Sequence, residues 1–148
     1  MNIAIGCDHG GFTLKGILID YLTEKGYEVR DFGCYSAESM DYPDMAFPLA
    51  EAVAGGAYER GIVICTTGVG VSICANKVKG IRCALCTNAH MAEMTRRHND
   101  ANMLALGAQV LEPELTKQVV DTFLTTPFDG GERHARRIGK IAAYEGNG

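Results

Sequence analysis

Short apolar runs alternate with longer amphipathic segments along the chain. Each of the five runs is brief and mostly apolar, which is typical of strands that are covered on both faces. The predicted strands are NIAIGC (2–7), YEVRDF (27–32), GIVICT (61–66), IRCALC (81–86) and MLALG (103–107).

The segments between and after these runs have the periodicity of helices. In 12–26, the side chains of Leu14, Leu18 and Leu22 share one helical face, and Gly26 ends the helix. Strand followed by helix, five times over, predicts an α/β protein with a five-stranded parallel sheet and right-handed crossovers. The other predicted helices are 44–56, 72–78, 89–99, 112–126 and a final basic helix over about 131–145.

Length and composition narrow the class of protein. A chain of 148 residues fits one domain, 1–148. The 14 basic and 18 acidic residues give a net charge of −4, which argues against a broad surface for nucleic acid or anionic lipid. The N-terminal apolar stretch is too short for a signal peptide, and no run approaches the ~20 apolar residues of a membrane span. We therefore expect a cytoplasmic protein whose six cysteines stay reduced, without disulfides.

Polar and reactive side chains gather where the predicted strands end. Ligands of open parallel sheets bind outside the carboxyl ends of the strands. Asp8 and His9 follow the first strand, the stretch 65–70 closes the third, and His98 with Asn99 precedes the fifth. Asp8 alone is equally consistent with a helix cap, and His9 beside it favours a functional pair.

The loop 66–70, TTGVG, has two interpretations. It is either a tight turn from strand to helix or an anion cradle whose backbone N–H groups converge at a helix N-terminus. Gly68 and Gly70 begin a GxGxxG pattern, but Ile73 occupies the third glycine position, so a dinucleotide is not expected. The chain also lacks a P-loop ending, and no GxSxG motif supports Ser72 as a nucleophile.

Cys65 is the one cysteine that we predict to be reactive. A cysteine in an apolar strand is usually part of the core, but Cys65 ends its strand beside a helix N-terminus, where a thiolate is stabilised. Cys83 and Cys86 form a CxxC, but this spacing on a strand puts the side chains on opposite faces and no second pair exists. We therefore predict no metal site.

Basic residues near the C-terminus offer a phosphate site. Arg133 and Arg137 are four residues apart on the predicted helix, so both guanidinium groups reach one side and suit a single phosphate. The alternative is a charged, solvated helix face, just as His98 is otherwise a solvated helix end.

Several motifs together resemble the type B ribose-5-phosphate isomerase family, which also includes the galactose-6-phosphate isomerase subunits. The similarity runs in order from about residue 2 to 140. The motifs are GCDHGGFTLK (6–15), DYPD (41–44), ICTTGVGVSICANKVKGIRCAL (64–85), RRHNDANMLALG (96–107) and GGERHARR (130–137). The resemblance implies a Rossmann-like three-layer α/β/α sandwich. It also implies aldose–ketose isomerisation of ribose 5-phosphate in the pentose phosphate pathway, with no metal or cofactor.

The same resemblance implies roles for individual residues. Cys65 is the base that moves a proton between C1 and C2, and His98 is the acid of ring opening. Asp8 and Thr67 also belong to the implied catalytic set. The substrate contacts are Asp8, His9, Thr66, Thr67, Gly68, Val69, Gly70, Asn99, Arg133 and Arg137. These roles are chemically reasonable because N–H donors stabilise the enediolate and an imidazole exchanges protons near neutral pH.

Three positions depart from the pattern of many relatives. Thr66 stands where a glycine is common, and Gln109 replaces an arginine that some members present to the phosphate. Val71 stands where one branch has a glutamate, which assigns this chain to the cysteine branch. Allose or galactose 6-phosphate is therefore the alternative substrate, and a non-catalytic phosphosugar-binding module is the alternative function. A nucleotide-binding domain is disfavoured, since TNAH (87–90) offers no acidic ribose contact.

The family also implies a homodimer, or a dimer of dimers, with active sites shared between subunits. His98 and Asn99 then lie across the interface from Cys65. The stretch GVGVSICANKV carries no charge before Lys77, so we expect its helix to be buried on more than its sheet-facing side. The alternative is that the rest of its own domain covers this helix.

Overall fold

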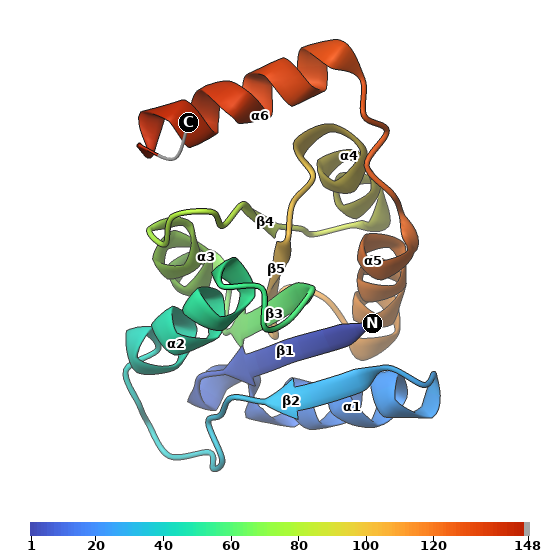
Figure 1. Ribbon diagram of the computed structural model, residues 1–148. Helices are drawn as coiled ribbons and strands as arrows, with labels where there is room; N and C mark the ends of the chain where they lie inside the picture. The colour runs from blue at the N-terminus through green and yellow to red at the C-terminus, as the bar shows by residue number, and fades with distance from the viewer. Residues whose placement is uncertain (147–148) are drawn as a thin grey trace.

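Five parallel strands form the centre of the molecule, with helices on both faces (Figure 1). The computed structural model describes residues 1–146, so the last two residues of the predicted domain, 147–148, lie outside the described residues. The strands pair in the order β2-β1-β3-β5-β4. They are β1 (Asn2–Cys7), β2 (Glu28–Asp31), β3 (Arg60–Cys65), β4 (Cys83–Leu85) and β5 (Met103–Gly107).

The helices build two outer layers around this sheet. Apolar side chains of α1, α4 and α5 cover one face, and those of α2 and α3 cover the other. The elements are η1 (His9–Gly11), α1 (Phe12–Glu24), α2 (Pro43–Ala54), α3 (Val69–Asn76), α4 (Ala89–Asn99), α5 (Pro113–Thr125) and α6 (Glu132–Tyr144). The predicted three-layer α/β/α sandwich is confirmed.

The fourth strand is shorter than predicted. Of the predicted 81–86, only Cys83–Leu85 is strand. Side-chain amides take the place of ladder partners at its start, because Asn102 Oδ1 accepts the N–H of Arg82 at 2.9 Å and Asn76 Oδ1 accepts that of Cys83 at 2.8 Å. Cys86 packs into the α1/α4/α5 layer and Cys83 into the other, so the predicted opposite facing of this pair is confirmed.

Helix α3 begins at Val69, three residues before the predicted start at residue 72. Gly68 takes a left-handed conformation, with φ of 82°, and its carbonyl accepts the N–H of Ser72 at 3.2 Å. A side chain at residue 68 would lie 2.6 Å from Leu85 Cδ1, so the turn requires glycine. The predicted loop 66–70 is therefore only 66–68, and Val69 and Gly70 belong to the first turn of the helix.

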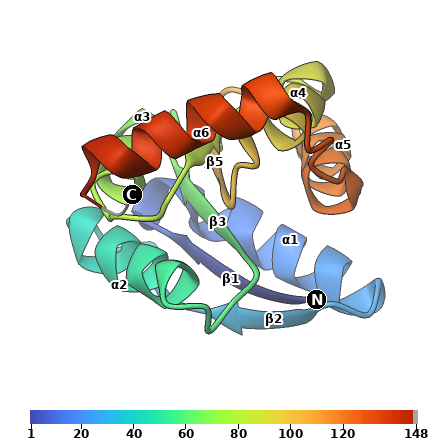
Figure 2. The same ribbon diagram turned by 45° about the horizontal axis from the view of Figure 1, so that its top comes forward.

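Helix α6 lies outside the three layers. It packs against α4 and extends over β4 toward the end of α3 (Figures 1 and 2). Its far end is tied to the loop after α3, where the N–H of Gly80 donates to Glu145 Oε1 at 3.4 Å. Ile141 of this helix lines a cavity of about 360 Å³ beside β4, and its side chain is 50% exposed. The helix covers an edge strand that would otherwise be open to pairing.

Candidate active site

The carboxyl ends of β1 and β3 bring two predicted site segments together. Cys7 pairs with Ile64 in the sheet, and the N–H of Asp8 donates to the Ile64 carbonyl at 3.1 Å. We call Asp8, His9, Cys65 and the residues 66–70 the carboxyl-edge half-site. The stretch 66–70 thus begins at the same edge of the sheet as Asp8 and His9, and Thr66 packs closely against Gly10.

Asp8 and His9 each use one side-chain atom to fix the fold and keep another for a ligand. Asp8 Oδ1 accepts the N–H of Gly10 at 2.9 Å, so the capping interpretation is correct. Its other oxygen makes no hydrogen bond within residues 1–146. His9 Nδ1 accepts the N–H of Met40 at 3.3 Å, so in the neutral ring the proton lies on the exposed Nε2 side. Each residue thus keeps a polar atom that makes no hydrogen bond within residues 1–146, and their contact with a sugar stays a prediction.

Cys65 is buried, with 6% of its surface exposed, at the start of the turn into α3. Its sulfur accepts the N–H of Gly68 at 3.1 Å. The N–H of Gly68 is therefore used in a hydrogen bond to the Cys65 sulfur, which the sequence did not predict. The backbone N–H groups of Thr67, Gly70 and Val71 have no partner in the described part of the chain. These three donors remain for an oxyanion.

Two further side chains shape this half-site. Tyr42 packs against the first turn of α3, because a side chain at Gly70 would lie 2.7 Å from Tyr42 Cζ. The DYPD motif contained Tyr42, but nothing in the motif indicated that its ring reaches this loop. Thr67 Oγ1 accepts the N–H of Val69 at 3.3 Å, which leaves the hydroxyl hydrogen available for a ligand. Burial, and then the charge of Cys65, raise the pKa of the neighbouring Cys74 thiol.

His98 and Asn99 lie at the opposite edge of the sheet. Helix α4 connects β4 to β5, so it runs antiparallel to the strands and ends at their amino edge. The Asn99 carbonyl accepts from Arg82 Nε at 2.8 Å, directly before the start of β4. Cys65 instead pairs with the last residue of β5. Four strand steps of about 3.3 Å separate these edges by about 13 Å.

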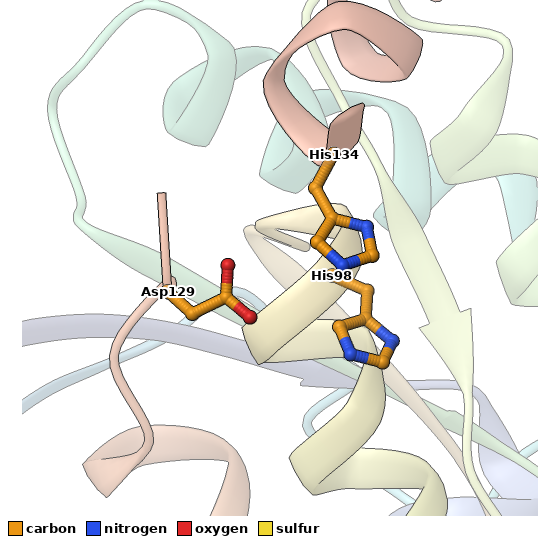
Figure 3. Close-up of side chains that lie close together, drawn as sticks. All are labelled: His98, Asp129 and His134. Atoms are coloured by element: carbon orange, nitrogen blue, oxygen red, sulfur yellow. The ribbon is translucent and has the colours of Figure 1, made fainter. Parts of the chain in front are cut away.

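A second histidine completes this amino-edge group. The rings of His98 and His134 stack with centroids 4.2 Å apart and planes 12° apart (Figure 3). The carboxylate of Asp129 lies beside them, and the ligand-type atoms of the three residues lie within 4.8 Å of one another. We call His98, Asn99, Asp129 and His134 the amino-edge half-site. The sequence placed His134 only on a charged helix face.

Burial and charge set the protonation of this group. Burial, and then the charge of His98, lower the pKa of His134. The N–H of Gly131 donates to Asp129 Oδ1 at 2.8 Å and lowers the pKa of that carboxyl, with a smaller contribution from His134. Imidazole lone pairs lie in the ring plane, so two nearly parallel rings do not aim at one ion. The stacked geometry does not favour a metal ion, and both the absence of a metal and the acid role of His98 stay predictions.

A buried arginine holds the turn that carries His98. Arg96 is 3% exposed and donates to Asp100 Oδ1 at 2.8 Å and to the Ala101 carbonyl at 2.7 Å. Asp100 adopts a left-handed conformation with φ of 45°, which ends α4 directly after Asn99. This ion pair explains why the motif RRHND contains both charges: they fix the helix end that presents the histidine.

The two predicted phosphate residues lie together on α6, away from Gln109, the position that departs from an arginine of some relatives. Arg133 and Arg137 flank His134 on α6, are exposed, and make no ion pair within residues 1–146. Gln109 lies instead at the carboxyl-edge half-site, where its N–H donates to the Thr66 carbonyl at 3.0 Å. Loss of an arginine at position 109 thus removes a positive charge beside the loop 66–68.

The parallel sheet and its helices define a Rossmann-like α/β protein, a class in which ligands bind at the carboxyl edge of the sheet. Residues 3–141 match the sequence model of the family described as Ribose/Galactose Isomerase. The chain belongs to this family.

Named relatives cover almost the whole chain. Ribose-5-phosphate isomerase B of Escherichia coli (strain K12) is 49% identical over 144 residues, 97% of this chain and 96% of that protein. D-erythrulose-4-phosphate isomerase of Pectobacterium atrosepticum is 42% identical over 146 residues, 98% of this chain and 95% of that protein.

Solved structures are equally similar. The Clostridium thermocellum ribose-5-phosphate isomerase B is 56% identical, with a TM-score of 0.96, and 99% of this chain and 98% of that chain are covered. The Mycoplasma genitalium ribose-5-phosphate isomerase B, solved with bound ribulose-5-phosphate, is 43% identical with a TM-score of 0.94, covering 99% and 97%. No helix in the described residues is long and apolar enough to cross a membrane.

Proposed function

We propose that this protein interconverts ribose 5-phosphate and ribulose 5-phosphate, with Cys65 as the base. The observation that carries the proposal is the Cys65 sulfur, which lies at the end of β3 beside backbone N–H groups that have no partner among residues 1–146. A base next to oxyanion donors is the arrangement that enolisation requires. The names of the relatives support the substrate class.

The proposed reaction moves one proton between two carbons and one between two oxygens. The Cys65 thiolate removes the proton from C2 of the open aldose, and the carbonyl oxygen at C1 becomes part of an enediolate. The N–H groups of Thr67, Gly70 and Val71 and the Thr67 hydroxyl stabilise this charge. A proton moves from the oxygen at C2 to that at C1, and the Cys65 thiol returns its proton to C1, which gives the ketose. Asp8 and His9 hold the sugar hydroxyls during these steps.

Ring opening belongs to the amino-edge half-site. Ribose 5-phosphate rests as a furanose, so an acid must protonate the ring oxygen before the carbonyl forms. His98 is the proposed acid, and Asn99 lies beside it for a contact with the sugar. Because about 13 Å of sheet separates the two half-sites in one chain, we assign each complete site to two chains: Cys65 of one subunit and His98 of the partner subunit.

Exposed apolar surface supports this dimer. Val69 and Ile73, which are four residues apart on α3, are 47% and 55% exposed. On α6, Ile141 is 50% exposed and Tyr144 is 95% exposed. A homodimer, or a dimer of dimers, that buries α3 next to Cys65 covers this surface and brings the partner's amino-edge half-site to the loop. Arg133 and Arg137 then bind the phosphate.

The test is an isomerase assay with purified, metal-stripped protein. We expect conversion of ribose 5-phosphate, unchanged by a chelator, because the proposed chemistry uses only side chains and backbone. Allose 6-phosphate, galactose 6-phosphate and erythrose 4-phosphate complete the panel, since one relative is a D-erythrulose-4-phosphate isomerase. Phosphosugar binding without conversion of any substrate would instead establish the binding module. The six reduced cysteines fit a cytoplasmic setting for this activity.

A further inference from the structure

Cys7 and Cys34 face each other next to the carboxyl-edge half-site, and the proposed reaction uses neither thiol. Their sulfur atoms are 3.8 Å apart. Cys7 ends β1 and is fully buried, whereas Cys34 lies after β2 and is half-buried. Within residues 1–146, this is the single hydrogen-bonding contact between two cysteine sulfurs. The pair is therefore placed for thiol chemistry with each other.

The backbone holds the two cysteines side by side. The N–H of Cys7 donates to the Gly33 carbonyl at 2.6 Å, and the N–H of Cys34 donates to the Cys7 carbonyl at 2.7 Å. A disulfide has an S–S distance of about 2.05 Å, so the sulfurs must approach by roughly 1.8 Å. We expect the segment around Cys34 to make most of this movement, because Cys34 lies outside helices and strands whereas Cys7 ends β1.

We propose that Cys7 and Cys34 form a reversible disulfide when the folded protein meets hydrogen peroxide, and that this disulfide weakens binding of the sugar phosphate. The Cys34 sulfur gives up its proton and attacks one peroxide oxygen, the O–O bond breaks, and the other oxygen leaves as hydroxide and takes up that proton, which gives a sulfenic acid and water. The Cys7 sulfur then attacks the sulfenic sulfur, and the hydroxyl leaves with the Cys7 proton as water. One peroxide is reduced, two thiols are oxidised, and two waters form.

The surroundings assign the first step to Cys34. Burial raises the pKa of Cys7 to about 12, although the nearby Lys15 charge acts in the opposite direction, so Cys7 stays a protonated thiol away from solvent. Cys34 is half-buried and therefore partly open to solvent, and Tyr35, the residue after it, lines a pocket of about 430 Å³ together with Lys15 and Asp31. Lys15 donates to the Cys34 carbonyl and to Asp31 Oδ1, the latter at 2.8 Å, and so fixes the segment on which Cys34 lies.

The consequence for binding follows from what each cysteine adjoins. Cys7 directly precedes Asp8, and the segment that follows Cys34 includes Met40, whose N–H holds His9 at 3.3 Å. When the two sulfurs move together, the two segments that position Asp8 and His9 are displaced. Loss of one hydrogen bond to the sugar weakens binding by up to about tenfold, so we expect the KM for ribose 5-phosphate to rise roughly tenfold.

Peptide mapping tests the disulfide without any assay of activity. Trypsin cleaves after Lys15, Arg30 and Arg60, so the peptide 1–15 contains Cys7 as its only cysteine and 31–60 contains Cys34 as its only cysteine. Folded protein is treated with hydrogen peroxide, its free thiols are alkylated, and it is digested without reductant. We expect the two peptides joined, two hydrogen atoms lighter than their sum, and separated again by dithiothreitol. Recovery of 1–15 with an alkylated Cys7 throughout would overturn the proposal.

Two variants control the experiment. Cys83→Ser removes the other half-buried cysteine and should leave the linked peptide unchanged. Cys34→Ser should leave Cys7 alkylated after the same treatment.

The KM comparison rests on the proposed function and uses only oxidised protein whose Cys65 still reacts with the alkylating reagent. A linked peptide with an unchanged KM would overturn the coupling to binding, and the absence of isomerase activity before oxidation would instead reject the proposed function.

Discussion

The two edges of the sheet differ in the kind of chemistry that they offer. The carboxyl edge presents a buried thiol, small residues and unpaired backbone N–H groups around Cys65. The amino edge presents stacked imidazoles and a carboxylate, held in place by a buried Arg96 and its ion pair with Asp100. The first arrangement suits a planar enediolate, and the second suits proton delivery to a sugar ring. Neither edge alone offers groups for both steps, so the proposed site draws on two chains.

The largest effect should come from the carboxyl edge. Cys65→Ala removes the proposed base, so kcat for ribose 5-phosphate should fall by roughly 10²- to 10⁴-fold with a much smaller change in KM. Cys74→Ala is the matched control, because this thiol lies near Cys65 and burial keeps it protonated. Steady-state kinetics of both variants make the comparison. If the Cys65→Ala enzyme keeps most of its kcat, Cys65 is not the base.

The amino edge should give a loss that depends on the ring. His98→Asn should lower turnover of ribose 5-phosphate by about 10²-fold, since it removes the acid that opens the furanose. Erythrose 4-phosphate carries its phosphate on O4 and does not close a furanose ring, so its turnover should be the same in both proteins. The measurement is the ratio of kcat/KM for the two substrates. An equal loss for both would show that His98 does more than open the ring.

Phosphate binding should show as a change in KM. Arg137→Ala should raise the KM for ribose 5-phosphate by roughly tenfold or more, since it removes a charge-assisted hydrogen bond to the phosphate. Arg136→Ala, on the neighbouring side of α6, should change it little. Thermal unfolding of both variants should match that of the unmodified chain, because both side chains are exposed. Equal losses toward phosphorylated and unphosphorylated sugars would contradict this assignment.

The smallest effect concerns stability and pH. The pKa of His134 is lowered in the folded chain from its ordinary value of 6.5. At a pH below 6.5 the unfolded chain therefore binds a proton at His134 more readily than the folded chain does. Its contribution to the free energy of unfolding is therefore lost as the pH falls from 7 toward 5. His134→Asn should flatten this part of the profile, whereas His90→Asn, at an exposed position on α4, should not. Denaturant unfolding at several pH values measures the free energy of unfolding of both variants. If the His134 variant loses stability between pH 7 and 5 as steeply as the unmodified chain, the prediction is wrong.

Much of the carboxyl edge was predictable because its residues are contiguous. The apolar runs located β1 and β3, and in a parallel sheet the residues that follow such strands share one edge. The start of α3 was predicted too late because the left-handed Gly68 turns the chain within a single residue. The backbone geometry of one glycine decides that boundary, and the hydrophobic pattern carries no signal for it.

The amino edge was less predictable because it depends on contacts between distant segments. His98 was singled out by its motif, but its stacking on His134 requires α6 to pack against α4. The short β4 likewise depends on side-chain amides of Asn76 and Asn102, which replace ladder bonds at the strand's start. Such pairings follow from tertiary packing, which periodicity along one segment does not report.

Subunit exchange tests the division into two edges most directly. Cys65→Ala and His98→Ala chains are dissociated, mixed in equal amounts and reassociated, and exchange is verified by native mass spectrometry. If sites are shared, each heterodimer has one intact site and one site with both defects, so the mixture should regain about one quarter of the unmodified activity on ribose 5-phosphate. A mixture that stays as inactive as its parents, despite complete exchange, would show that Cys65 and His98 act within one chain.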